Sequence, residues 1–306
     1  MSSDSLPPFF LNAFYEAKFA GALFVVKASG DVVDDDAALA ALMDDIKALI
    51  FRGIRVLLVY GGGGPVDAAL EKSGVPVVKR EGRRVTDAKT LQVLQAEIGG
   101  RIALKVHAAM AKARMEALAF NAVPPGWLDV RLRPKEPHDF GLVGDIAGAS
   151  GRDIARAFRA APCLATACLA ATADGTAVNI NADTVATDLA IAAGADKLLF
   201  LSNVSGVLVD GARAFTLADA DIPGLIARGA ATGGMRVKLE NAARALAAGV
   251  GRVHILSGLE PGALGREVFE SVGPGTMVLK EAEREAYLRE IEIHRRIERV
   301  ANHAGS

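Results

Sequence analysis

Short apolar runs alternate with longer amphipathic segments along most of the chain. Runs of this length are typical of strands buried on both faces, whereas the amphipathic segments favour helices. The predicted strands are Leu23–Ala28, Ile54–Tyr60, Cys163–Leu169, Lys197–Ser202 and Val253–Leu256, with Met277–Lys280 closing the body. The predicted helices are Asp34–Phe51, a segment from the glycines at 61–64 through about Ser73, Asp87–Phe120 (loosened at Gly99-Gly100), Gly151–Ala160, Asn181–Gly194 and Gly234–Ala248. Strands that alternate with helices predict an α/β fold with a mostly parallel central sheet.

The middle and the two ends of the chain depart from this alternation. The segment from Pro124 to Val143 holds four prolines and short β-like pieces, which predicts hairpins or a lid over a site. Asp174-Gly175 predicts a hairpin turn. Residues 1–19 are predicted as an N-terminal arm and 281–306 as a charged helical tail, which is either a solvated helix or a subunit contact. Because no linker interrupts residues 20–280, they are predicted as one domain whose two lobes share a sheet.

Composition narrows the class of protein. The chain has 306 residues, 51% of them hydrophobic and 23% charged, with a formal net charge of −1. The absence of a basic excess argues against a nucleic-acid partner, and the charged content is too ordinary for a disordered chain. No apolar run approaches the roughly 18–20 residues of a membrane-spanning helix, so no membrane association is expected. The two cysteines, Cys163 and Cys168, lie in one apolar segment and are predicted to be free thiols in a reducing cytoplasm.

Glycine is over-represented, at 32 of 306 residues against a usual share of about 7%. The run Gly61–Gly64 follows an apolar strand and opens a helix, a position where backbone N–H groups can face an anion. It is not a Walker loop, because no Gly-Lys-Ser/Thr closes it, and it does not fit the dinucleotide fingerprint. A plain tight turn remains an equally good explanation of the run taken alone.

Two lysines and one aspartate strengthen the anion-site interpretation. Lys27 ends the first predicted strand, and the carboxyl ends of parallel strands are where α/β proteins bind ligands. Lys238 lies near the start of a helix after Gly233-Gly234, and Asp183 opens another helix after Asn181. Asp183 and Asn181 could simply cap that helix. Together, however, two lysines held by one carboxylate suit phosphoryl transfer, where catalysis is mainly electrostatic positioning.

The order of several motifs resembles that of N-acetyl-L-glutamate kinases, which belong to the amino-acid kinase family. The motifs are Val25-Val26-Lys27-x-x-Gly30, Gly61-Gly62-Gly63, Arg84-Val85-Thr86-Asp87, Gly141-Leu142-Val143-Gly144, Asn179-x-Asn181-Ala182-Asp183 and Gly233-Gly234-Met235-x-x-Lys238. The resemblance implies a three-layer αβα sandwich with an acceptor-binding lobe at about 20–170 and an ATP-binding lobe at about 171–280. It also implies transfer of the ATP γ-phosphoryl group to the side-chain carboxylate of N-acetylglutamate, with Mg²⁺ bound with ATP and no dedicated metal site in the protein.

The resemblance also assigns roles to residues of this chain. Catalysis would fall to Lys27 and Lys238, which stabilise the transferring phosphoryl group, and to Asp183, which orients both lysines. The acceptor side would be formed by Gly62, Gly63, Arg84 and Asn179, with Arg84 clamping the α-carboxylate of the acceptor. The nucleotide side would be formed by Gly30, Asn203, Gly234 and Met235.

Three positions depart from the family pattern. Ser29 replaces the first glycine of Lys-x-Gly-Gly, in a form similar to that of uridylate kinases; Tyr60 replaces a common histidine; and residues 121–127 lack the usual glycine-rich pattern. These departures leave open a sister kinase with another carboxylate or phosphate acceptor, as well as a non-catalytic homologue that senses arginine or nucleotide. The arm at Leu11–Phe19 lies where arginine-inhibited, hexameric members of the family carry an interlacing helix, so the resemblance motivates the hypothesis of a higher oligomer with arginine feedback. The partners expected are a small-molecule acceptor, ATP and further copies of the chain in a homodimer or higher homo-oligomer. The five histidines show no metal-binding spacing and are expected to be structural or exposed.

Overall fold

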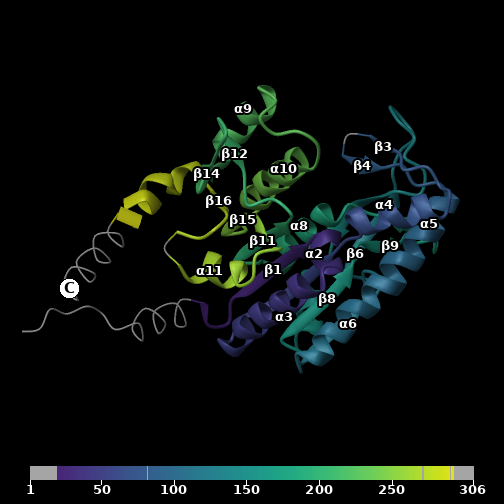
Figure 1. Ribbon diagram of the computed structural model, residues 1–306, viewed down its shortest axis with the longest axis horizontal. Helices are drawn as coiled ribbons and strands as arrows, with labels where there is room; N and C mark the ends of the chain where they lie inside the picture. The colour runs from purple at the N-terminus through teal and green to yellow at the C-terminus, as the bar shows by residue number, and fades with distance from the viewer. Residues whose placement is uncertain (1–18, 81, 271, 290, 293–306) are drawn as a thin grey trace, which may run out of the picture.

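The centre of the molecule is an eight-stranded, mostly parallel sheet between two layers of helices (Figure 1). The computed structural model describes residues 19–292 except positions 81, 271 and 290. The strand order is β14 (Thr216–Ala218), β16 (Thr276–Leu279), β15 (Arg252–Ser257), β11 (Lys197–Ser202), β1 (Leu23–Ala28), β2 (Arg55–Tyr60), β8 (Cys163–Ala167) and β5 (Ala117–Phe120). Within this sheet the pair β15–β16 is antiparallel, and the other neighbours run parallel. The α/β fold with a large, mostly parallel sheet is confirmed.

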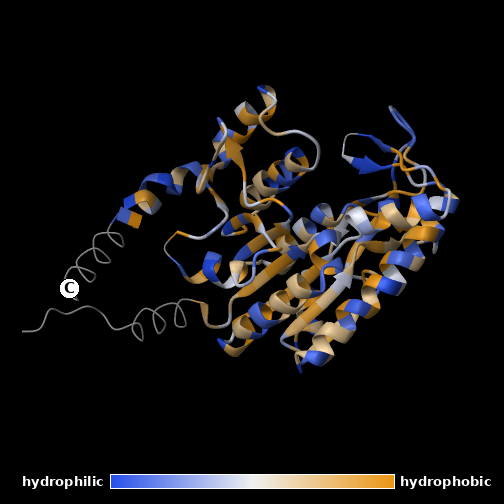
Figure 2. Cartoon of the chain, viewed as in Figure 1, coloured by the Kyte–Doolittle hydropathy of each residue, from blue (hydrophilic) through white to orange (hydrophobic). Residues whose placement is uncertain are grey.

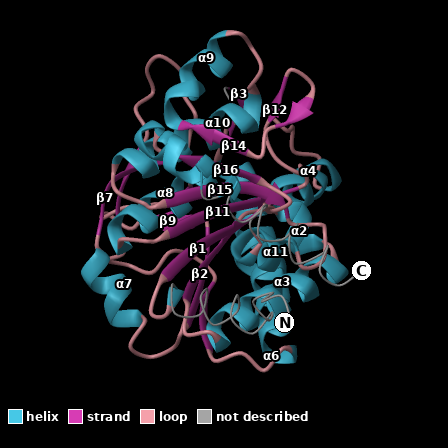
Figure 3. Ribbon diagram, turned by 90° about the vertical axis from the view of Figure 1, so that its left-hand side faces the viewer, coloured by secondary structure: helices cyan, strands magenta, loops and turns pink. Residues whose placement is uncertain are grey.

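Helices cover both faces of the sheet, which explains why the central strands are apolar along their whole length. On one face α8 (Ala182–Ala193) contacts β1, β2 and β11, and on the other α3 (Asp36–Phe51) contacts β2 (Figure 3). Every residue of β1 and β11 is buried, Lys27 included. Figure 2 shows the hydrophobic residues concentrated along the strands and on the helix faces that cover them. Two-sided burial therefore produces continuous apolar runs instead of an alternating pattern.

Most of the remaining helices follow the predicted segments, with ends set by caps and turns, whereas the short helices at 30–34, 222–227 and 263–269 match no predicted segment. They are α2 (Gly30–Asp34), α4 (Gly63–Lys72), α5 (Ala88–Leu94), the π-helix η1 (Gln95–Ile102), α6 (Ala103–Lys112), α7 (Gly151–Ala157), α9 (Ile222–Ala227), α10 (Gly233–Ala247) and α11 (Ala263–Phe269), with a 3₁₀ turn η2 at Asp219–Asp221. Side chains of Asp35, Asp87, Ser150 and Asn181 accept backbone N–H bonds at the starts of α3, α5, α7 and α8. These caps satisfy N–H groups that have no partner inside the helix.

The predicted helix Asp87–Phe120 is wrong at its carboxyl end. Helical structure stops at Lys112, and Arg114 has a positive φ of 53°, a conformation that a helix cannot continue through. Ala117–Phe120 forms the edge strand β5 beside β8. A short apolar run of Ala, Leu and Phe fits a helix or a strand, and only its pairing with β8 decides between them. The loosening predicted at Gly99-Gly100 corresponds to the π-helical turn η1.

Small antiparallel hairpins lie outside the central sheet. In the middle segment β6 (Leu128–Leu132) pairs with β7 (Gly144–Ala149), and Asp174-Gly175 forms the predicted turn between β9 (Leu169–Ala171) and β10 (Ala177–Asn179). The apolar run predicted as the single strand Cys163–Leu169 is divided at Cys168 between β8 and β9. Two short hairpins, β3 (Lys79–Arg80) with β4 (Arg83–Arg84) and β12 (Leu208–Val209) with β13 (Ala212–Arg213), carry no signal in the apolar pattern.

The two predicted terminal segments are described only in part. The arm at 1–19 lies outside the described residues except for Phe19. Residues 281–289 are helical, as expected for the tail, and 293–306 lie outside the described part of the chain. Among the described residues no helix has both the length and the apolar character needed to cross a membrane.

Candidate active site

Two glycine turns meet at the carboxyl ends of β1 and β2. The parallel register pairs Ala28 with Tyr60, so the turns that follow these residues leave the sheet at the same edge. Gly30 opens α2 and Gly63 opens α4. A Cβ atom on Gly30 would lie only 2.1 Å from the carbonyl oxygen of Gly62, so the two backbones touch directly. The first N–H groups of α4 have no partner inside that helix and are available to an anion.

Lys27, Asp183 and Lys238 form a buried chain of ion pairs next to these turns. The Asp183 Oδ1 atom lies 2.8 Å from Lys27 Nζ, and its Oδ2 atom lies 2.9 Å from Lys238 Nζ. The three side chains are 6%, 8% and 11% exposed for Asp183, Lys27 and Lys238. Lys27 comes from the end of β1, Asp183 from the first turn of α8 and Lys238 from the second turn of α10. Three segments that are distant in sequence therefore bring the trio together.

The electrostatics of this trio favour the charged carboxylate. Burial alone would raise the pKa of Asp183, but the two ammonium groups outweigh it and lower that pKa to about 2. Burial lowers the pKa of Lys27, and the ion pair with Asp183 opposes that shift. Asp183 therefore keeps its negative charge and holds two ammonium groups in a nearly dry environment.

A cleft of about 440 Å³ lies against this trio and collects most of the predicted site residues. Its lining includes Lys27, Gly30, Gly62, Gly63, Arg84, Asn179, Asp183 and Gly234. Lys238 joins them through its ion pair with Asp183. Asn203 is exposed just beyond β11, and Met235 packs against the hydrophobic core; neither lines this cleft. Their nucleotide-binding roles stay predictions.

Arg84 and Asn179 form another part of the cleft wall. The Nη2 group of Arg84 donates to Asp67 Oδ1 at 2.5 Å, whereas its Nη1 group is buried without a hydrogen-bond partner. The Nδ2 group of Asn179 donates to Thr86 Oγ1 at 3.3 Å. Ser29, the departure from the family pattern, also lines the cleft, and its buried hydroxyl lacks a partner. Unpaired buried donors are costly in a protein, so these atoms are suited to bind a polar ligand.

The structure adds cleft residues that the sequence reasoning missed. Lys79 lines the cleft and donates to Asp67 Oδ2 at 2.6 Å. Cys168 also lines it, and burial raises the pKa of its thiol to about 11. Both cysteines are free and buried, as predicted. Asp67 lies on α4, three residues after the glycine run, but a single acidic residue on a helix gives no sequence signal of a partner.

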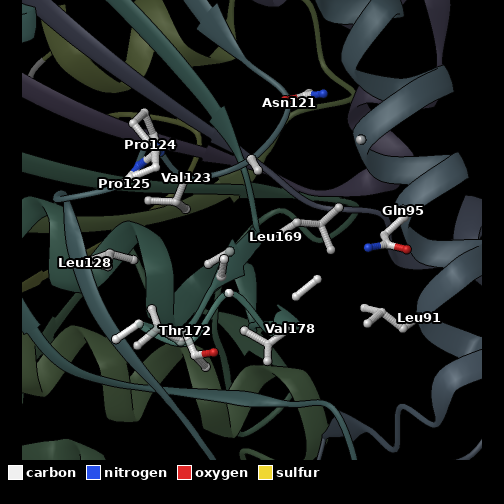
Figure 4. Close-up of a pocket in the computed structure, with 18 of the residues that line it drawn as sticks. Leu91, Gln95, Asn121, Val123, Pro124, Pro125, Leu128, Leu169, Thr172 and Val178 are labelled. Carbon is white, nitrogen blue, oxygen red and sulfur yellow. The ribbon is translucent and has the colours of Figure 1, made fainter.

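A larger cavity of about 830 Å³ is lined in part by Gln95, Gly99 and Gly100 of η1 (Figure 4). Figure 4 shows Leu169, Val178 and Gln95 around it, and residues 121–126 contribute part of its wall. Its lining contains one charged residue, Asp129, and neither lysine nor arginine. Despite its size it lacks the cations that phosphoryl transfer requires, so the smaller cleft is the candidate active site.

A second buried polar cluster lies in the other half of the sheet. His254 Nδ1 lies 2.7 Å from Glu267 Oε1, and its Nε2 atom lies 3.1 Å from Lys197 Nζ. Burial, with the neighbouring Lys197, lowers the pKa of His254 to about 4, so the imidazole is neutral at pH 7. His254 is thus a structural histidine, in line with the expectation. No group of three or more His, Cys, Asp or Glu side chains placed to hold a metal ion occurs in the described part of the chain.

The chain matches a family model, curated protein sequences and solved structures. A family model for the amino acid kinase family matches residues 22–257. An acetylglutamate kinase from Sorangium cellulosum (strain So ce56) is 41% identical over 268 residues, which cover 83% of this chain and 94% of that protein. One from Myxococcus xanthus (strain DK1622) is 36% identical over 88% of this chain and 92% of its own length. The solved structure of N-acetylglutamate synthase from Neisseria gonorrhoeae, complexed with coenzyme A and N-acetyl-glutamate, superposes with a TM-score of 0.82 at 24% identity. The superposed part covers 91% of this chain and 64% of the synthase chain.

Proposed function

The chain belongs to the amino acid kinase family, and from this premise we propose that it phosphorylates the side-chain carboxylate of N-acetyl-L-glutamate with ATP, in arginine biosynthesis. The product is an acyl phosphate. The observation that carries the proposal is the buried Lys27–Asp183–Lys238 trio beside two glycine turns. The names of the curated relatives, acetylglutamate kinases at 31–41% identity, supply the acceptor.

In the proposed reaction the chain acts by positioning and by charge. A carboxylate oxygen of the acceptor attacks the γ-phosphorus, the bond from that phosphorus to the β–γ bridging oxygen breaks, and ADP leaves with the bond electrons. Negative charge spreads over the equatorial and bridging oxygens, where Lys27 and Lys238 stabilise it. Asp183 fixes the positions of both ammonium groups before the substrates arrive, so little reorganisation is needed at the transition state. The N–H groups at Gly30, Gly62 and Gly63 add donors that carry no net charge.

The residues that bind the acceptor are assigned from the polar groups in the wall of the cleft. The free Nη1 group of Arg84 binds the α-carboxylate of the acceptor, and Asn179 binds its acetamido and carboxylate groups. A guanidinium group is suited to this role because its donors are fixed in one plane. The acceptor-binding lobe at about 20–170 and the ATP-binding lobe at about 171–280 are part of the proposal, as are the nucleotide contacts of Gly234, Met235 and Asn203.

ATP is the phosphoryl donor that the family implies, and Mg²⁺ is proposed to enter with it. The cleft fits a polyphosphate, because the buried Lys27 and the N-terminus of α4 line it, and Lys238 is joined to Lys27 through Asp183. Bound to the phosphates, Mg²⁺ would neutralise part of their charge without a cage of protein ligands. We further propose that the enzyme works in the cytoplasm and as a homodimer or higher homo-oligomer.

One observation supports a second candidate, a sister kinase with a different acceptor. Ser29 places a buried, unpartnered hydroxyl in the cleft where the family pattern has glycine, and this hydroxyl could bind another acceptor group. A non-catalytic sensor is disfavoured, since the lysine pair and Asp183 are all present and in contact.

An acceptor panel separates these candidates. Release of ADP is measured by a coupled assay with N-acetylglutamate, N-acetylaspartate, aminoadipate derivatives and UMP, and hydroxylamine traps any acyl phosphate. We expect turnover with N-acetylglutamate and a hydroxamate product. No turnover with N-acetylglutamate, but turnover with another acceptor, would favour the sister kinase; no turnover with any acceptor would favour the sensor.

A further inference from the structure

A single carboxylate ties the β3–β4 hairpin to α4. Asp67, on α4, accepts from Lys79 of β3 through Oδ2 at 2.6 Å and from Arg84 of β4 through Oδ1 at 2.5 Å. Each strand of the hairpin therefore contributes one cation to the same carboxylate. The hairpin is only two residues long on each side, so these two ion pairs help to fix its position relative to the helix.

The two ion pairs differ in their exposure. The side chains of Arg84, Asp67 and Lys79 are 10%, 25% and 48% exposed, so the series runs from the interior of the cleft to its mouth. Burial would raise the pKa of Asp67, but its hydrogen bonds with Lys79 and Arg84 lower it overall. Asp67 is thus a carboxylate throughout the neutral range, and its charge balances one of the two cations.

The pairing of Asp67 with Arg84 also fixes the orientation of the guanidinium group of a residue that lines the cleft. Because the guanidinium group is planar, holding Nη2 on Asp67 fixes the plane in which Nη1 points. That Nη1 group is buried and has no hydrogen-bond partner, and Arg84 lines the cleft. Asp67 itself is not among the residues that line it. It therefore acts on the cleft through Arg84 and Lys79.

The tip of the same hairpin reaches the opposite wall of the cleft. Gly82 has a φ of +75°, and a Cβ atom built on it would lie 3.4 Å from the carbonyl oxygen of Gly233 and 3.3 Å from Val237 Cγ2. Both belong to α10, the helix that carries Lys238. The hairpin thus spans from α4 to α10, so its attachment to α4 determines where Arg84 lies relative to the lysines.

We propose that Asp67 is a positioning residue for acceptor binding. Its carboxylate aims the free Nη1 group of Arg84 into the cleft and holds Lys79 at the mouth, where both cations attract an acceptor carboxylate. The identity of the acceptor rests on the proposed function, whereas the role of Asp67 rests on these contacts. Asp67 touches neither the phosphoryl group nor the lysine pair in this role, so its loss affects acceptor affinity and spares the chemical step.

The test compares Asp67→Asn with Asp145→Asn. Asp145 of β7 makes a matched ion pair at 2.5 Å with Arg133, the residue that follows β6, and neither residue lines the cleft. We expect Asp67→Asn to raise the acceptor KM by about tenfold, as for loss of one charge-assisted hydrogen bond. Its kcat and ATP KM should stay within about twofold of wild type. Asp145→Asn should change none of the three. Equal damage to kcat and ATP KM, or an unchanged acceptor KM, would overturn the proposal.

A double-mutant cycle tests whether Asp67 acts through Arg84. In an Arg84→Ala background, Asp67→Asn should raise the acceptor KM by no more than about threefold, because Arg84 is already gone and only the attachment of Lys79 is left to lose. A full tenfold increase in that background would show an independent role and refute the positioning argument. Should Asp67→Asn fail to fold, Lys79→Met removes only the half-exposed pair; we expect about a threefold rise in acceptor KM, and an unchanged value counts against the proposal.

The acceptor panel keeps this test separate from the proposed function. Absence of turnover with N-acetylglutamate contradicts the proposed substrate, and the comparison is then made with the acceptor that the enzyme does use. Calorimetric titration of N-acetylglutamate into the wild type and into Asp67→Asn supplies a readout that does not depend on turnover. Equal affinities of the two proteins would overturn the role of Asp67.

Discussion

Replacement of Asp183 by asparagine removes the negative charge between the two buried lysines and nearly preserves the shape of the side chain. In the wild type each ammonium lies less than 3 Å from a carboxylate oxygen. At an effective dielectric constant of about 20, unit charges 2.8 Å apart attract by about 6 kcal/mol. Burial opposes much of this: the fall in the pKa of Asp183 from 3.8 to about 2 corresponds to a net preference for the charged form of about 2 kcal/mol.

The variant leaves two ammonium groups facing each other without a counter-charge. We expect kcat to fall by about 10²–10³-fold, comparable to removal of one donor that stabilises transition-state charge. The pH dependence should change as well. Burial already lowers the pKa of Lys27, and the charge of Asp183 partly restores it, so its loss lowers that pKa further. Activity requires the protonated lysine, hence the alkaline decline of kcat should begin at lower pH in the variant.

The coupled ADP assay, run from neutral to alkaline pH with saturating substrates, measures both effects. Asp188→Asn is the control, because Asp188 pairs with Arg244 at 2.7 Å and also links α8 to α10, but lies outside the cleft. The control should keep wild-type kcat and its pH profile. A variant kcat within tenfold of wild type, or an alkaline decline that stays in place, would refute the assignment of Asp183 as the residue that holds both lysines.

Three further predictions follow from the same structure. Arg84→Ala should raise the acceptor KM far more than the ATP KM in steady-state kinetics; equal increases would contradict its role as a carboxylate clamp. Gly30→Ala would place a Cβ atom 2.1 Å from the carbonyl oxygen of Gly62, so urea unfolding should reveal a loss of about 1–3 kcal/mol, whereas Gly234→Ala, whose Cβ meets nothing within 4 Å, should lose far less. His254, with its pKa lowered from 6.5 to about 4, stays neutral in the folded protein while the unfolded chain takes up a proton, so the free energy of unfolding should fall by up to about 3 kcal/mol as pH drops from 6.5 to 4. His254→Gln should flatten that dependence in urea melts, and an unchanged slope would contradict it.

The central sheet could be predicted from the sequence because it depends on local signals, and the members of the lysine–aspartate trio could be predicted because each stands in a motif whose order resembles that of the family. Strands that are buried on both faces, such as β1 and β11, have continuous apolar sequences that can be recognised directly. The glycines that follow β2 indicate the place where its backbone approaches the backbone of Gly30 closely. Segment 117–120 could not be assigned correctly, since its strand state depends on pairing with β8, which is distant in sequence. For a short apolar run of this kind, tertiary contacts and not the local pattern decide whether the run forms a helix or a strand.

Parts of the site depend on contacts that the sequence does not encode locally. Asp67 is one acidic residue among many on helix surfaces, and only the folded hairpin brings Lys79 and Arg84 to it. The cluster of Lys197, His254 and Glu267 joins two strands and a helix, none of whose residues is unusual on its own. Conversely, Asn203 and Met235 carry motif signals but lie away from the cleft wall, so motif position alone does not determine which side chains face a site.

Cys168 places a sulfur atom in the wall of the cleft, next to the lysine pair. Thiolates, not thiols, react with oxidants and alkylating reagents. With a pKa raised to about 11, only about one molecule in ten thousand carries the thiolate at pH 7. Burial therefore protects the sulfur in this cleft from oxidation by peroxide and from alkylation by electrophiles, because both reactions need the thiolate. The sulfur contributes its volume and its apolar contacts to the cleft wall.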